Sequence, residues 1–248
     1  MVLAKYQYKE TRALEFSFKN WFFIFTKKLK TECIDNFIFE SDELASVVEA
    51  FCLEKKPDFL YLWGESGVGK THLNLAIAER LQNQGYPVSY INLQELRDTA
   101  DAEVLASLVQ SHVVCLDDLQ AICGDAEWEE ALFHCFNRLR EKEHKLLICA
   151  DQNPAQLAIQ LPDLRSRLAT GLIYQLPSMT DALKQQALIS HAQSRGLILP
   201  EEVAQYLLRN YSRDMASLML VLQRLDKASL QAQRRLTIPF VREVIQRG

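Results

Sequence analysis

The sequence predicts an α/β protein with a five-stranded parallel sheet that has helices on both faces, followed by a small all-helical domain. From about residue 57, short apolar runs alternate with helical patterns, as in parallel sheets that are covered on both sides. After Pro177 the strand-like runs cease, and helical patterns follow one another to the end of the sequence. At 248 residues the chain is long enough for two such units.

The predicted strands are short runs of β-branched or apolar residues. They are Phe59–Trp63, Val88–Leu93, Val113–Leu116, Leu146–Ala150 and Leu172–Leu176. Two of the helices between them are expected over Thr71–Gln82 and Glu127–Arg140. The second has apolar residues at i, i+3, i+4, i+7, i+8 and i+11, which places them on one face. We interpret its Trp128 and Phe136 as core residues.

The last part of the chain predicts four helices with ordinary start and stop signals. The signals are a cap at Ser178 or Thr180, a stop at Gly196, a proline start at Pro200, an amphipathic run over Met215–Ala232, and a start at Thr237 and Pro239. We therefore expect three segments, namely an atypical basic and aromatic segment over residues 1–32, a nucleotide-binding α/β domain over residues 33–177, and a helical lid domain over residues 178–248.

Charge is distributed unevenly along the chain. The formal net charge of −4 argues against a surface that binds DNA generally. Residues 1–30, however, hold seven basic and two acidic side chains, a net charge of +5, whereas the other residues carry −9. Three interpretations of this basic segment stay open: a divergent partner-docking peptide, a weak phosphate-binding arm, or a stretch upstream of the true start.

The cysteines and the apolar runs indicate a cytoplasmic protein. None of the six cysteines has the C-x-x-C spacing of zinc or redox sites, so we expect reduced thiols. No apolar run approaches the roughly 20 residues that span a bilayer. The aromatic cluster at residues 21–25 is also too short for a signal peptide.

A phosphate-binding loop is the strongest motif in the sequence. The pattern G-x-x-x-x-G-K-[ST] is matched at every fixed position by Gly64, Glu65, Ser66, Gly67, Val68, Gly69, Lys70 and Thr71. Glycines let the backbone wrap closely around phosphate oxygens. Lys70 would place a positive charge between the β- and γ-phosphates, and the Thr71 hydroxyl would bind Mg²⁺. The motif follows a predicted strand and opens a predicted helix, as this chemistry requires.

Further polar residues follow the other predicted strands. Asp117 and Asp118 end an apolar run, so that Asp117 would hold Mg²⁺ and Asp118 could orient the attacking water. Asp151 follows another strand and could position the water or the γ-phosphate, or simply begin a turn; both interpretations stay open. Arg165 and Arg167 precede the last strand, and the residues alone suggest only solvated arginines.

Together these motifs resemble the initiator clade of the AAA+ proteins, P-loop ATPases that include the bacterial replication initiator DnaA and DnaA-related regulators. The likeness extends over about residues 33–248. It is carried by Tyr61-Leu62-Trp63-Gly64, Lys70-Thr71-His72-Leu73, Leu116-Asp117-Asp118-Leu119, Gly124-Asp125-x-x-Trp128-Glu129, Leu161-Pro162-Asp163-Leu164-x-Ser166-Arg167-Leu168 and Leu236-Thr237-Ile238-Pro239-Phe240-Val241.

The resemblance implies roles for several residues. Arg167 matches the arginine finger that acts in trans on a nucleotide held by a partner. Arg213 matches the sensor-2 arginine of the lid, and Asp151 matches the sensor-1 position. The segment Ile34–Phe37 resembles the one that lines the adenine pocket, although a plain core role for Phe37 stays open. The implied ligands are ADP or ATP and Mg²⁺.

The resemblance also implies a function, that of a negative regulator which stimulates hydrolysis of ATP bound to DnaA, together with the DNA polymerase sliding clamp. No clamp-docking peptide of the family's type is evident. Strong direct DNA binding is not expected, because DnaA's C-terminal DNA-binding domain has no counterpart before Gly248, and homo-oligomers are possible. The alternatives are an autonomous ATPase similar to helicase loaders, which the complete phosphate loop favours, and a partner of a membrane-associated protein anchored by residues 16–25.

Overall fold

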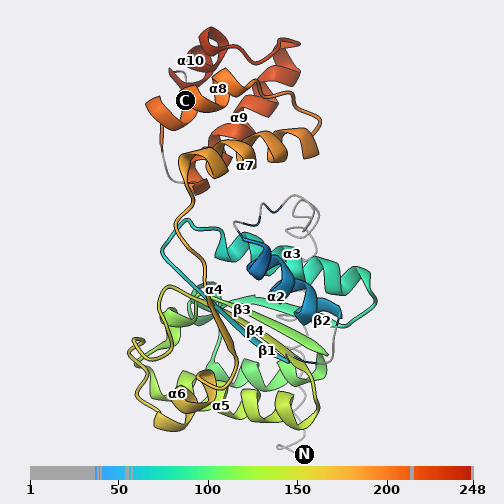
Figure 1. Cartoon of the computed structure of the whole chain (residues 1–248). Coiled ribbons are helices and arrows are strands. Elements are labelled where there is room, and N and C mark those ends of the chain that lie inside the picture. The colour runs from blue at the N-terminus through green and yellow to red at the C-terminus, as the bar shows by residue number, and fades with distance from the viewer. Residues whose placement is uncertain are drawn as a thin grey trace, which may run out of the picture.

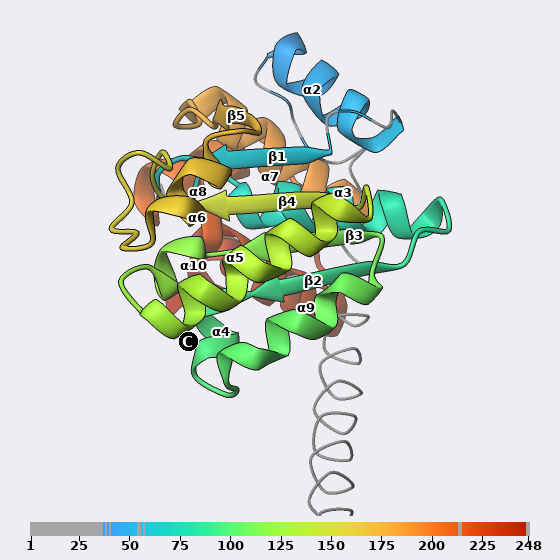
Figure 2. The same cartoon turned by 90° about the horizontal axis from the view of Figure 1, so that it is seen from below.

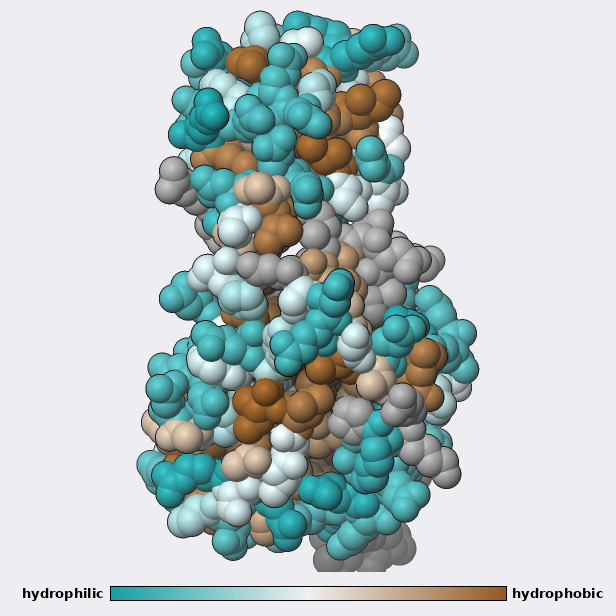
Figure 3. Space-filling model, in the orientation of Figure 1, coloured by the Kyte–Doolittle hydropathy of each residue, from teal (hydrophilic) through white to brown (hydrophobic). Residues whose placement is uncertain are grey.

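The computed structural model describes Phe37, Phe39, residues 41–53, Lys56, and residues 58–212 and 215–246, with the backbone alone described at residue 216. The expectations for residues 1–36 and for Arg213 lie outside these residues. Two bodies follow one another along the described chain and meet at a narrower waist (Figures 1 and 3). On the face that Figure 3 shows, hydrophilic side chains cover much of both bodies.

The first body is built on a parallel sheet, as the sequence predicts. Its strands are β1 (Phe59–Trp63), β2 (Val88–Asn92), β3 (Val113–Asp117), β4 (Lys145–Ala150) and β5 (Leu172–Gln175). Among the described residues they form one sheet in the order β2-β3-β4-β1-β5, with every neighbouring pair parallel. The predicted strand Phe59–Trp63 matches β1 at both ends, and each of the other four predicted strands differs from the observed one by one residue at one end. β2 stops before Leu93 because the Asn92 side chain accepts a hydrogen bond from the Glu95 amide (3.0 Å) and caps the next helix.

Helices cover both faces of the sheet (Figure 1). One face is covered by α2 (Asp42–Leu53) and α3 (Lys70–Asn83), and the other by α5 (Ala126–Glu141) and the 3₁₀ helix η2 (Ala102–Gln110). Side chains alternate along a strand, so β1 directs Leu60 and Leu62 toward α2 and α3, and Phe59 and Tyr61 toward α5. The apolar stripe predicted for α5 is buried except at the partly buried Ala131, and the charged Glu129 is buried beside it.

Short helical elements join these layers at one edge of the sheet. They are α4 (Leu93–Arg97), η3 (Leu119–Ile122) and α6 (Pro162–Leu168). Viewed from below, α6 lies at the end of the sheet toward which the strands run (Figure 2). Of the six cysteines, the five in the described residues are free thiols, as expected.

The second body is helical and has its own core. It contains α7 (Asp181–Ser194), α8 (Glu201–Asn210), α9 (Met215–Ala232) and α10 (Ile238–Gln246). Thr180 caps α7, because its hydroxyl accepts a hydrogen bond from the Leu183 amide (3.2 Å). Gly196 adopts the left-handed φ of 74° just after that helix. None of the helices within the described ranges is long and apolar enough to cross a bilayer.

Candidate nucleotide-binding site

The carboxyl edge of the sheet brings the predicted motifs together. In the strand register, Trp63 at the end of β1 lies opposite Ala150 of β4 and Gln175 of β5. The Gly64 amide donates to the Ala150 carbonyl (3.3 Å), so the phosphate loop starts directly against the strand that Asp151 follows. Parallel strands place the residues that follow them at one edge, which is where ligands bind in such sheets.

The loop over residues 64–69 depends on its glycines for steric reasons. A Cβ on Gly64 would lie 2.5 Å from the Leu176 carbonyl oxygen, closer than atoms can pack. Gly69 has a φ of 96°, a left-handed conformation that side chains other than glycine rarely adopt. Within the same loop, Val68 is buried in the core, and the Glu65 carboxylate accepts a hydrogen bond from the Ser178 hydroxyl (3.1 Å) of the connection to the helical body.

Lys70 holds its ammonium group inside this loop. Its side chain is buried, and Nζ donates to the carbonyl oxygens of Gly64 (2.7 Å) and Glu65 (2.9 Å). Lys70 is also the first residue of α3, whose amino end has no side-chain cap in the part of the chain that the structure describes. Uncapped backbone amides together with a buried ammonium group suit an anion such as a phosphate.

Asp117 is a fully buried carboxylate at the end of β3. It accepts hydrogen bonds from the Tyr90 hydroxyl (3.0 Å) and the Asp118 amide (3.1 Å), and the Thr71 side chain also hydrogen-bonds to it. Burial raises the pKa of Asp117 and the neighbouring Asp118 charge adds to this rise, while the bonds from Thr71 and Tyr90 oppose it. A buried carboxylate beside a hydroxyl fits Mg²⁺, which takes few protein ligands and keeps waters and phosphate oxygens.

Asp118 is held by two amide side chains. Its φ of 56° is left-handed, and its carboxylate accepts from Asn92 Nδ2 (2.7 Å) and Gln120 Nε2 (2.9 Å). The other end of the Gln120 amide accepts from the Asp151 backbone amide (3.2 Å). Three strand ends are thereby joined. Sequence reasoning missed Asn92 and Gln120, although Asn92 is a polar residue next to the end of the predicted strand Val88–Leu93, which was a usable signal.

Asp151 lies beside this network, and one oxygen of its carboxylate accepts no hydrogen bond from the described residues. Its Oδ1 atom is buried and has no hydrogen-bond partner among the described residues. A buried acceptor without a partner is costly in an isolated protein, and a bound ligand or water can satisfy it. Asp151 thus presents an open acceptor at the carboxyl edge of the sheet, where the chain also bends after β4.

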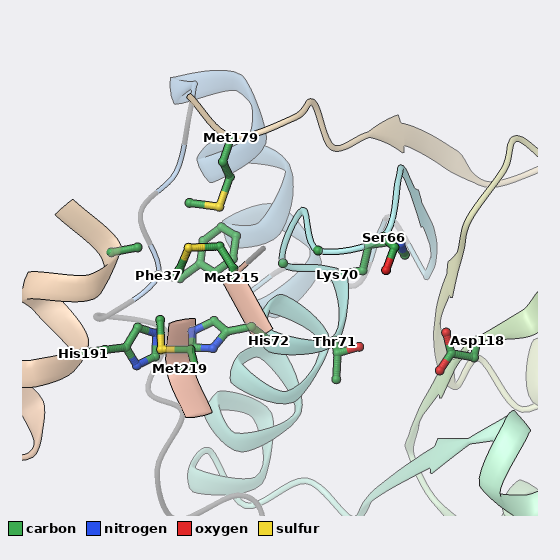
Figure 4. A pocket seen from close by; sticks show the side chains of 13 residues that line it. Phe37, Ser66, Lys70, Thr71, His72, Asp118, Met179, His191, Met215 and Met219 are labelled. Atoms are coloured by element: carbon green, nitrogen blue, oxygen red, sulfur yellow. The ribbon is translucent and has the colours of Figure 1, made fainter. Parts of the chain in front are cut away.

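A cavity of about 450 Å³ opens above the phosphate loop, between the two bodies (Figure 4). The loop side is lined by Ser66, Gly67, Gly69, Lys70, Thr71 and Asp118, and the other side by Phe37, His72, Met179, Ala187, His191, Met215 and Met219. The second set is apolar or aromatic, as suits the face of a nucleobase. Phe37 lines the cavity and also packs against the hydrophobic core of the first body.

Aromatic rings join the two bodies at this cavity. The His72 ring lies 5.6 Å from that of Phe37 in a stacked arrangement and 4.7 Å from that of His191 in a T-shaped one. Burial, and to a smaller extent the neighbouring His191, lower the pKa of His72 to about 4. Burial and Arg195 lower the pKa of His191 as well. Both rings are therefore neutral near pH 7, as a pocket for an uncharged base requires.

Arg167 lies apart from the cavity. It is exposed on α6 and is not among the described residues that line the cavity. Arg165 of the same helix is also exposed, whereas Leu164 and Leu168 anchor the helix in the core.

Comparison with known proteins identifies the family to which the chain is related. A model of the bacterial DnaA ATPase domain matches residues 30–175, and a model of the Hda lid domain matches residues 181–245. An uncharacterized protein from Haemophilus influenzae is 47% identical over 192 residues, which cover 77% of this chain and 82% of that protein.

Solved structures share the fold at low sequence identity. Domain III of the replication initiation protein DnaA from Thermotoga maritima is similar with a TM-score of 0.73 and 22% identity, covering 88% of this chain and 96% of that one. The branch migration motor RuvB from the same organism has a TM-score of 0.64 at 19% identity, covering 88% and 72% of the two chains. The family matches extend over both bodies, and the fold agrees with them. The chain belongs to the family of DnaA-related AAA+ proteins.

Proposed function

We propose that this DnaA-related AAA+ protein is a negative regulator of replication initiation. It binds ADP or ATP with Mg²⁺ and stimulates hydrolysis of ATP held by the initiator DnaA, with the sliding clamp as a further partner. The matches to the DnaA ATPase domain and to the Hda lid domain support a DnaA-related replication regulator. The finer role, inactivation of DnaA, rests on the placement of one arginine.

The nucleotide would occupy the cavity above the phosphate loop. Lys70 and the amino end of α3 would face its phosphates, and the Phe37, His72 and His191 rings would face its base. Thr71 and Asp117 would hold Mg²⁺, which neutralises phosphate charge when bound. The lid helices α7 and α9 would contact the same nucleotide through His191 and the two methionines of α9.

The observation that carries the regulatory role is the exposed position of Arg167. An arginine that served this chain's own nucleotide would be expected to line the cavity, and among the described residues Arg167 does not. An exposed arginine on a helix with buried anchor residues is suited to enter the site of another molecule. Its guanidinium would stabilise charge that develops on the partner's ATP, and such arginines are worth roughly 10³- to 10⁵-fold in rate in related NTPases.

The test is hydrolysis by ATP-loaded DnaA in the presence of clamp and DNA. The wild-type protein should accelerate hydrolysis, and Arg167→Ala should remove at least about tenfold of that acceleration. Arg165→Ala, which removes an equally charged and exposed side chain from the same helix, should retain most of it. Equal acceleration by the wild-type and Arg167→Ala proteins would contradict the proposal. Omitting the clamp tests whether it is a partner.

A second candidate function is an autonomous ATPase of the helicase-loader type. It is favoured by the complete set of Lys70, Thr71, Asp117 and Asp118 at one sheet edge. Each oxygen of Asp118 accepts one hydrogen bond from an amide side chain and keeps a second lone pair, and Asp118 lines the cavity, so its carboxylate could also accept from a water there. A substantial ATPase of the protein alone that Lys70→Ala abolishes would favour this candidate over the regulator.

A further inference from the structure

Glu129 is a buried carboxylate on α5 that the proposed chemistry does not use. Its side chain is only 1% exposed, although the neighbouring Glu130 is exposed. Buried carboxylates are rare in proteins unless their oxygens are paired. Among the described residues, the hydrogen-bond partners of the Glu129 carboxylate are all backbone amides.

Three backbone amides bind this carboxylate, one from the loop just before α5 and two from the distant segment that precedes α6. Oε1 accepts from the Gly124 amide (2.7 Å) and the Gln160 amide (3.1 Å), and Oε2 accepts from the Gln160 amide (2.9 Å) and the Leu161 amide (2.7 Å). The Gln160 side chain returns a bond to the Gly124 carbonyl (3.1 Å). Only an ionised carboxylate offers enough acceptors for this set, because an amide side chain has a single acceptor oxygen and would direct its NH₂ group at other donors.

The segment that Glu129 holds leads directly into the helix of Arg167. Leu161 immediately precedes α6, and the chain between β4 and Leu161 contains no helix or strand. Within α6 itself, Leu164 and Leu168 are the buried residues. The amino end of α6 is thus fixed to the rest of the body by the Glu129 carboxylate rather than by regular secondary structure.

The loop that contains Gly124, which the Glu129 carboxylate connects to α6, is itself held in place. Gly124 has a left-handed φ of 84° just before α5, and Asp125 caps α5 by accepting from the Trp128 amide (3.5 Å). Arg97 of α4 pairs with Asp125 (3.3 Å) and donates to the Ala121 carbonyl. The carboxylate therefore connects α6 to a well-held loop beside the nucleotide site.

We propose that Glu129 is a positioning residue for Arg167, holding the backbone of α6 so that the exposed arginine meets a partner's nucleotide in one geometry. This inference rests on the proposed function, because it gives Arg167 a role in trans. A misplacement of about 1 Å at a reacting centre can reduce a rate by about 100-fold, so a loosened helix is enough to impair stimulation. Glu129 is not among the described residues that line the cavity above the phosphate loop.

The first test is the stimulation assay with DnaA, clamp and DNA. Glu129→Gln should lose at least about tenfold of the stimulation while its own affinity for ADP changes by less than about twofold. Glu130→Gln removes the same charge one residue further along and should behave as wild type. The double variant Glu129→Gln with Arg167→Ala should be no worse than Arg167→Ala alone, as expected for residues that act as a unit.

Full stimulation by Glu129→Gln would overturn the inference, and so would a further loss in the double variant. If Glu129→Gln does not fold, Gln160→Ala replaces it, because that change removes the bond to the Gly124 carbonyl and leaves the carboxylate in place. It should lower stimulation by about two- to fivefold, as expected for one neutral hydrogen bond. Unchanged stimulation by Gln160→Ala would then overturn the inference.

A second measurement does not depend on DnaA. Amide hydrogen exchange of a peptide covering residues 157–168 should be at least about tenfold faster in Glu129→Gln than in Glu130→Gln, whereas peptides of β3 and β4 should exchange alike in both. Unchanged exchange over residues 157–168 would overturn the inference. Faster exchange there, together with equal stimulation by wild-type and Arg167→Ala proteins, would support the junction and contradict the proposed function instead.

Discussion

The His72 and His191 side chains, one from each body of the protein, are in contact with each other. His72 belongs to the helix that opens with the phosphate-binding lysine, and His191 belongs to the first helix of the second body. The pKa of His72 is lowered to about 4 from the ordinary value of 6.5, chiefly by burial. A histidine in the unfolded chain binds its proton at a higher pH than this one does in the folded protein.

The sign of the pH effect follows from that difference. Between about pH 6.5 and 4 the unfolded state binds more protons than the folded state, so the free energy of unfolding falls as the pH is lowered through this range. From pH 7.5 to pH 5, His72 alone should account for a loss of at most about 2 kcal/mol. Urea unfolding of the wild-type and His72→Gln proteins at both pH values measures it.

We expect the pH-dependent loss to be smaller in His72→Gln than in the wild type. His134→Gln, which removes an exposed histidine of α5, serves as the matched control and should show the full loss. An equal loss in wild-type and His72→Gln proteins would mean that the His72 ring is not buried as described.

At the scale of single residues, the residues that could be predicted from the sequence are those that belong to a recognisable local pattern. Lys70, Asp117 and Asp118 stand in a motif or after an apolar run, and all lie at the predicted sheet edge. Glu129 and His72 could not be predicted in the same way, because Leu161 and His191, with which they interact, are distant in sequence and only tertiary packing brings these residues together. The roles of Arg167 and Asp151 stay predictions.

Among the elements, helix α2 was not predicted from the sequence, yet it contributes to the buried core and hence to the stability of the fold. It covers the sheet face beside α3, and its Phe51 is fully buried. Truncation of a fully buried phenylalanine costs about 3–5 kcal/mol, since contacts are lost and a cavity remains. We expect Phe51→Ala to lower the free energy of unfolding by that amount, measured by urea unfolding with the wild type alongside.

Leu53 of the same helix provides the control, because it is 60% exposed. Leu53→Ala should change the free energy of unfolding by no more than about 0.5 kcal/mol. A loss below about 1 kcal/mol for Phe51→Ala would contradict the placement of α2 against the sheet.

The elements that the sequence predicted well are those with a regular pattern. Buried parallel strands are continuous apolar runs, and α5 has a long apolar stripe, so both are recognisable from composition and period alone. The short helices α4, η3 and α6 have too few turns to show a period. Helix α2 precedes the first predicted strand and is not among the elements that the sequence predicts.

At the scale of the whole molecule, the cavity is formed by both bodies. Phe37 and His72 line it from one side, and His191, Met215 and Met219 line it from the helical side. A nucleotide bound there would have to be released before the two bodies separate, so its binding free energy would oppose their separation. The proposed lid over residues 178–248 would then be held by the nucleotide rather than by direct contacts alone.

This predicts protection of both bodies from amide hydrogen exchange in the full chain. With ADP and Mg²⁺ at 100 times the dissociation constant, the bound nucleotide stabilises the closed arrangement of the two bodies by up to about 2.7 kcal/mol. Amide exchange through any opening that releases the nucleotide should then be up to about 100-fold slower. Peptides of α7 and α9 should slow along with the phosphate loop, while α10, which does not line the cavity, should slow less. Lys70→Ala should show none of this protection, because it lacks the buried ammonium group. Protection of the phosphate loop without any change in α7 and α9 would mean that the helical body does not close on the nucleotide.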